Sequence, residues 1–140
     1  MKKTILIGLI ALATAETFGG VVADTIYLEA RGEGEIGMLA VATTIYNRAK
    51  NKNKTFEQIC LQPKQYSCWN GSKTLKITPK NDLDRKAYDL CIKIEESLLN
   101  GKFQPLGDWT HYYAYKVCNP SWAIGQKAVK IGNHKFLKVK

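Results

Sequence analysis

The chain has 140 residues of ordinary globular composition, which is enough for one domain with its own core and argues against long disordered segments. Lysine and arginine number 21 against 12 acidic residues, and this formal net charge of +9 suits nucleic acid, an anionic membrane surface or an anionic cell wall. No zinc-finger spacing, aromatic RNA-binding signature or basic heptad helix is present, so a nucleic-acid partner is disfavoured.

The first residues have the pattern of a secretory signal peptide. Met1–Lys3 is positively charged, residues 4–15 are uncharged and mostly apolar, and Ala13–Ala15 fits a small-x-small cleavage site. We therefore predict a signal peptide over 1–15, export to the envelope, periplasm or medium, and one domain over 16–140 with no stable membrane partner. The alternative is an uncleaved anchor over 4–23, interrupted by the charge of Glu16.

The first predicted helix covers 21–31 and has a glutamate on its apolar face. Val22, Ile26 and Ala30 share an arc with Glu29 at the helical period of about 100° per residue. A carboxyl group beside apolar side chains resists ionisation, so we predict a raised pKa for Glu29 and a role as general acid. The alternative is that Glu29 only borders the apolar arc and extends to water.

A second helix is predicted over 35–50, after the glycines of 32–34. Glu33 and Glu35 stand at its start, where carboxylates stabilise the helix dipole. Glu33 becomes a candidate second carboxylate beside Glu29 only if the first helix continues past Gly32. The apolar residues of the second helix cover most of its circumference, which predicts that the helix is buried. These residues are Ile36, Leu39, Ala40, Val41, Ala42 and Ile45.

Shorter elements and a third long helix follow. A short helix is predicted over 55–60, with Thr55 as N-cap and Gln58 completing a capping box, and a short strand over 65–69. The helix over 81–98 has a clear apolar stripe: Leu83, Ala87, Leu90, Cys91, Ile94 and Leu98. After Pro105 we predict loops and short strands. The fold class is therefore α+β and mostly helical, with three main helices and a small irregular β portion.

The four cysteines are Cys60, Cys68, Cys91 and Cys118. An even number of cysteines in an exported chain predicts disulfides, and three pairings are open. No pair of cysteines has metal-ligand spacing, and the two histidines, at 111 and 134, lack an obvious acidic third ligand. We therefore expect no metal site and no cofactor.

The aromatic segment over 109–115 is a candidate sugar-binding strand. A glycosidase needs a protonated acid beside the scissile oxygen, together with a groove that holds the sugar rings. Glu29 is the candidate acid, and this segment is a candidate wall of the groove. The alternative is an ordinary strand with a half-buried aromatic face.

Six blocks stand in order along residues 27–136. They are Tyr27-Leu28-Glu29-Ala30-Arg31-Gly32-Glu33, Gly37–Ala42 leading to Tyr46-Asn47-Arg48, Gln65-Tyr66-Ser67-Cys68-Trp69, Thr110-His111-Tyr112-Tyr113-Ala114, Pro120-Ser121-Trp122 and Ile131-Gly132-Asn133-His134-Lys135-Phe136. In content and order these blocks resemble the SleB-type cell-wall hydrolases, also called spore-cortex-lytic enzymes.

The resemblance implies a lysozyme-like fold related to the lytic transglycosylases. The implied reaction cleaves the β-1,4 bond between N-acetylmuramic acid and N-acetylglucosamine in peptidoglycan glycan strands, with Glu29 as the catalytic residue. Substrate contacts are expected at Gln65, Tyr66, Ser67, Trp69, Thr110, His111, Tyr112 and Tyr113. Tyr113 replaces the second histidine of the family's Thr-His-Tyr-His motif, and tyrosine is a poor base near neutral pH, so we expect only substrate contact from it.

Two functions from different classes follow. The first is an exported, monomeric lytic transglycosylase in which Glu29 acts as acid and then as base, with plain hydrolysis through Glu33 or Glu35 as a variant. The alternative is a non-catalytic cell-wall-binding protein of the envelope, which has the same fold and uses the aromatic groove and the positive charge only to bind.

Overall fold

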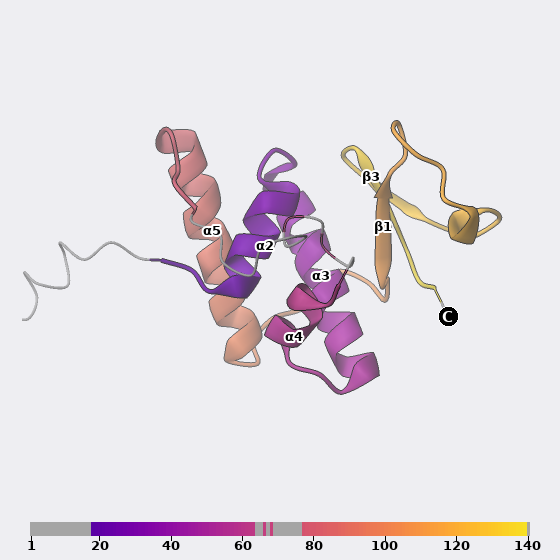
Figure 1. The fold of residues 1–140 in the computed structure, drawn as a ribbon, viewed down its shortest axis with the longest axis horizontal. Helices are drawn as coiled ribbons and strands as arrows, with labels where there is room; N and C mark the ends of the chain where they lie inside the picture. Colours follow the sequence, from indigo (N-terminus) through magenta and orange to yellow (C-terminus); the bar gives the residue numbers. More distant parts are fainter. Residues whose placement is uncertain (1–17, 64–65, 67, 69–76, 140) are drawn as a thin grey trace, which may run out of the picture.

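The computed structural model describes residues 18–63, 66, 68 and 77–139. Its elements are α2 (Val21–Ala30), α3 (Gly34–Lys52), α4 (Phe56–Leu61), α5 (Asp82–Leu99), β1 (His111–Ala114), the 3-10 helix η2 (Ser121–Ala123), β2 (Val129–Ile131) and β3 (His134–Leu137). The α-helices lie together, and the sheet lies beyond α3 on the side away from α5 (Figure 1). This arrangement confirms the predicted fold class.

Helix α2 is fixed at its N-terminus by side chains of α5. The carboxylate of Glu95 accepts hydrogen bonds from the backbone N–H of Gly20 and of Ala23, both at 2.9 Å. These donors have no partner inside the helix, so Glu95 caps α2 from a distant part of the chain. Tyr88 adds a second link, because its hydroxyl donates to Asp24 at 2.7 Å and accepts from the N–H of Gly19 at 3.0 Å.

Helix α3 is the central helix, as its apolar circumference predicts. Met38, Val41 and Ile45 are almost fully buried. Ile36 is the exception, since 57% of its surface is exposed in the first turn of the helix. The prediction that Ile36 is buried is therefore wrong.

The two remaining helices match their predicted signals, with one correction. Thr55 and Gln58 form the predicted capping box at the start of α4. In α5 the predicted stripe is confirmed at Cys91 and Ile94, which are buried. Leu83 is 78% exposed, because the first turn of α5 extends to solvent.

The sheet is antiparallel, with strand order β1-β3-β2. Tyr112 pairs with Phe136 in the register of β1 and β3, and Ala114 pairs with His134. Because side chains alternate along a strand, Tyr112, His134 and Phe136 share one face of the sheet, while His111 and Tyr113 lie on the other. The predicted aromatic strand therefore forms, and it has two different faces.

The structure does not test the predictions for the N-terminus. The signal peptide over 1–15 and most of the alternative anchor lie outside the described residues, as do Gln65, Ser67 and Trp69 of the predicted strand over 65–69. The other two residues of that strand, Tyr66 and Cys68, are not part of the sheet. In the part of the chain that the structure describes, no helix is long and apolar enough to span a bilayer.

The cysteine prediction needs a correction, because all four cysteines are free. Cys60 and Cys91 are fully buried on two different helices, and Cys91 lies against the sulfur of Met38 at 3.7 Å. Burial raises the pKa of both thiols to about 12. These two cysteines therefore fill the core as small apolar side chains.

Candidate active site

Glu29 lies in the last turn of α2 and is half-buried. Its carboxylate is hydrogen-bonded to the hydroxyl of Tyr112, which comes from β1. Burial raises the pKa of Tyr112 well above its usual value, and the charge of Glu29 raises it further. Tyr112 therefore keeps its proton at neutral pH and is a constant donor to Glu29.

The ring of Tyr112 is held by its neighbours on the sheet. Its centre lies 5.3 Å from that of Phe136 and 5.4 Å from that of His134, which it meets edge to face. Phe136 is 1% exposed, so this face of the sheet is anchored in the core. The aromatic packing fixes the direction in which the Tyr112 hydroxyl points, toward α2.

Tyr66 and Cys68 also lie close to Glu29. Burial raises the pKa of Tyr66 to about 12, and Glu29 contributes to the increase. The pKa of Cys68 is raised to about 11, by burial first and by Glu29 second. One predicted contact block, over 65–69, thus reaches the candidate acid through its two described residues.

Side chains of α3 fix the segment that leads into β1. The amide of Asn47 donates to the carbonyls of Gly107 at 3.1 Å and Trp109 at 2.7 Å. Arg48 is buried, donates through Nε to the carbonyl of Thr110 at 2.6 Å, and lies over the ring of Tyr66 at 5.5 Å. These contacts set the position of β1 and therefore bring Tyr112 to Glu29, a role that the sequence did not predict.

Glu33 connects the helices to the turn between β2 and β3. It occupies the N-cap position of α3, but its carboxylate makes no bond to that helix. It accepts instead from the backbone N–H of Asn133 at 3.2 Å and from the side-chain amide of Asn133 at 3.3 Å, and it lies 3.6 Å from Nδ1 of His134. The neighbouring Gly132 has a φ of +58° and no room for a side chain against this carboxylate.

The predicted contact block over 110–113 divides between the two faces of the sheet. Thr110 is buried, and its hydroxyl accepts from the N–H of Val139 at 3.1 Å and bonds Nδ1 of His111 at 2.8 Å. His111 and Tyr113 contact Trp122, which is 40% exposed, at ring distances of 5.4 and 5.8 Å. Only Tyr112 of this block faces Glu29.

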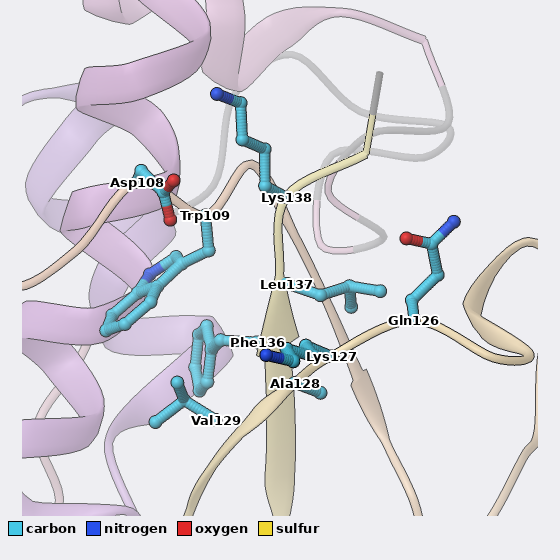
Figure 2. A pocket seen from close by; sticks show the side chains of 9 residues that line it. All are labelled: Asp108, Trp109, Gln126, Lys127, Ala128, Val129, Phe136, Leu137 and Lys138. Atoms are coloured by element: carbon cyan, nitrogen blue, oxygen red, sulfur yellow. The ribbon is translucent and has the colours of Figure 1, made fainter.

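Cavity size does not identify the candidate site. A pocket of about 620 Å³ lies beside β3 and the Asp108–Trp109 segment, and it does not include Glu29 (Figure 2). We place the candidate site by chemistry, at the contact between Glu29 and Tyr112. Among the described residues there is no group of three or more histidine, cysteine or acidic side chains that could hold a metal ion.

Comparisons with known proteins identify the family and the fold. Residues 32–137 match the model of the cell wall hydrolase family, so the match begins three residues after Glu29. The fold is similar to the catalytic domain of the germination-specific lytic transglycosylase SleB from Bacillus anthracis, with 26% identity, a TM-score of 0.60, and coverage of 84% of this chain and 91% of that one.

The catalytic domain of the SleB protein from Bacillus cereus is similar in fold, with 24% identity, a TM-score of 0.61, and coverage of 89% of this chain and 95% of that one. No curated protein matches. The mostly helical fold and its small antiparallel sheet are thus those of the SleB catalytic domains, which are lysozyme-like. Since the family model spans most of the chain, the protein belongs to the cell wall hydrolase family.

Proposed function

We propose that this protein is an exported peptidoglycan lytic transglycosylase with Glu29 as its single catalytic carboxylate. The bond cleaved is the β-1,4 link between N-acetylmuramic acid and N-acetylglucosamine. The observation that supports the proposal is the half-buried Glu29, hydrogen-bonded to Tyr112, in a fold similar to the SleB catalytic domain. A protein that only binds the wall has no need for a carboxylate held in this way.

In the proposed reaction Glu29 acts twice. Its protonated carboxyl donates a proton to the glycosidic oxygen as the bond from that oxygen to the anomeric carbon breaks. The resulting carboxylate then takes the proton of the muramic acid 6-hydroxyl, whose oxygen attacks the anomeric carbon. The product is a 1,6-anhydro sugar, no water is consumed, and Glu29 ends in its protonated form.

Tyr112 orients Glu29 in both steps. Its hydroxyl donates to the carboxylate, and donation to a charged form stabilises that form in the second half of the cycle. Glu33 is held by Asn133 and His134, which favours a mechanism with one carboxylate over hydrolysis with two.

The remaining substrate contacts stay proposals. Gln65, Ser67 and Trp69 belong to the block whose described members lie near Glu29. We assign Tyr66 and Thr110 to the shaping of the wall of the groove, because both are buried. His111 and Tyr113, together with the exposed Trp122, form an aromatic surface on the other face of the sheet.

The compartment and partners follow from the proposed substrate. Peptidoglycan lies outside the cytoplasm, so the protein needs the signal peptide that we predict over 1–15. The partner is the glycan strand, and the site described above is complete within one copy of the chain. Removal of 1–15 would take away Lys2 and Lys3 and leave 19 basic against 12 acidic residues, a net charge of +7, which is consistent with attraction to the wall polymer.

Mass spectrometry of the muropeptides released from purified peptidoglycan tests the proposal. We expect new ends that carry 1,6-anhydromuramic acid. Reducing ends would show that the protein is a hydrolase instead, and binding without any released product would identify a wall-binding protein. The masses of the released muropeptides distinguish the first two outcomes, because a reducing end is heavier than a 1,6-anhydro end by one water.

A further inference from the structure

A second cavity adjoins the candidate site but is lined by different chemistry. Its volume is about 390 Å³, and it is lined by Arg48, Asn51, Lys52, Thr110, His111, Lys138 and Val139. These residues come from α3, from the start of β1 and from the segment after β3. Arg48 borders both places, because it lines this cavity and also lies 5.5 Å from the ring of Tyr66, the neighbour of Glu29.

The lining of this cavity is cationic. It includes two lysines and a buried arginine, and none of the lining residues is an aspartate or glutamate. The positive charge of the lining also acts on His111. Burial is the largest cause of its lowered pKa, and the charges of Arg48 and Lys52 lower that pKa further. A bound anion would relieve this repulsion and would accept hydrogen bonds from lysine side chains on the rim.

The chain runs from this cavity directly to the candidate site. Thr110 and His111 line the cavity, and the next residue, Tyr112, bonds Glu29 from the face of the sheet opposite to His111. The muramic acid ring next to the scissile bond carries a peptide on its lactyl group. Three extended residues span about 10 Å, and such a peptide bears carboxylates along this length. A peptide arm on a sugar at Glu29 therefore carries the charge that this cationic cavity would bind.

We infer that this cavity binds a carboxylate of the peptide stem of peptidoglycan, so that the protein distinguishes peptide-bearing from bare glycan strands. The inference rests on the proposed function, since it assumes a muramic acid ring at Glu29. Of the two lysines in the cavity, Lys52 is the one whose replacement we expect to change peptide binding more. Lys138 also lines the neighbouring pocket, whose lining includes Asp108 (Figure 2).

The test compares binding of soluble probes to the whole chain by nuclear magnetic resonance titration. One probe is the disaccharide of the two wall sugars with a tetrapeptide stem, and the other is the same disaccharide without the peptide. The variants are Lys52→Gln, Lys138→Gln and the double change. The matched control removes two exposed lysines of α5, as Lys86→Gln with Lys93→Gln, which lowers the net charge equally.

We expect the wild-type protein and the control to bind the peptide-bearing probe about tenfold more tightly than the bare disaccharide. Lys52→Gln should reduce that preference about three- to fivefold, and the double change should nearly abolish it, as for partly exposed ion pairs. Affinity for the bare disaccharide should not change. Thermal melting confirms that each variant is folded.

Two results would overturn the inference. One is a wild-type protein that binds both probes equally. The other is a double variant that prefers the peptide-bearing probe as strongly as the wild-type protein does. Because the titration needs no turnover, a protein that binds the peptide-bearing probe but releases no muropeptide would refute the proposed function and leave this inference standing.

Discussion

The hydroxyl of Tyr112 is hydrogen-bonded to the candidate acid, and removing this single atom makes a sharp test. Replacing Tyr112 with Phe removes the donor and keeps the ring packing on Phe136 and His134. A hydrogen bond to a charged group is worth about 1.5–3 kcal/mol, so we expect kcat to fall roughly 10- to 150-fold with little change in melting temperature. Tyr115→Phe, one residue past the C-terminal end of β1, is the matched control.

The pH profile adds a readout that a packing defect would not change. A donor to a carboxylate favours the ionised form and lowers its pKa. Tyr112→Phe should therefore raise the pKa of Glu29 and, because the resting enzyme needs Glu29 protonated, shift the alkaline limb of the rate profile to higher pH. An unshifted profile in a folded, slow variant would show that Tyr112 does not act through Glu29.

At the scale of secondary structure, helix α2 depends on a cap that comes from another helix. Glu95→Ala removes the acceptor for the N–H groups of Gly20 and Ala23. Caps are worth about 0.5–2 kcal/mol, so we expect a loss of this size in the free energy of unfolding by urea titration. Glu96→Ala, the exposed neighbour, should cost much less. Equal losses would mean that the cap contributes nothing specific.

The link between Glu33 and the β2–β3 turn predicts a graded response. Glu33→Gln keeps an oxygen that accepts from Asn133, while Glu33→Ala removes both bonds. We expect the glutamine variant to retain most of its muropeptide release and the alanine variant to lose about tenfold, because β3 and the Tyr112 ring that packs on it shift away from α2. A glutamine variant as inactive as the alanine one would make the charge of Glu33 essential.

Local patterns predict most of the elements but not how they meet. Apolar periodicity and capping residues identify each long helix within about two residues, since these signals are local. The pairing of Tyr112 with Glu29 depends on strand register and on Asn47 and Arg48, which are far from both in sequence. Glu95 as a cap is equally non-local. For β1, the alternation of side chains along a strand would have been enough to predict that Tyr112 faces the opposite way from His111 and Tyr113.

At the scale of the whole molecule, the candidate site lies where the helices meet the sheet (Figure 1). α2 contributes the acid, β1 contributes its partner, and α3 joins the two through Asn47 and Arg48. The site is therefore sensitive to the spacing between two parts of the fold rather than to one element. Changes that loosen this spacing should lower kcat before they unfold the protein.

The free cysteines give a global test of the structure. Cys118 is exposed and Cys68 is half-buried, while Cys60 and Cys91 are buried with raised pKa values. A thiol reagent should therefore modify one cysteine quickly in the native protein and all four after unfolding without reductant. Fewer than four reactive thiols after unfolding would show that disulfides form in the mature chain, as the even count predicted.

The central claim is that Glu29 is the acid and base of glycan cleavage, and one substitution tests it directly. Glu29→Gln keeps the size of the side chain and an acceptor for Tyr112 but has no transferable proton. We expect muropeptide release to fall at least about 10²- to 10⁴-fold in a protein whose circular dichroism is unchanged, while Glu96→Gln stays at the wild-type rate. A folded Glu29→Gln protein that keeps more than about a tenth of the wild-type activity would contradict the account.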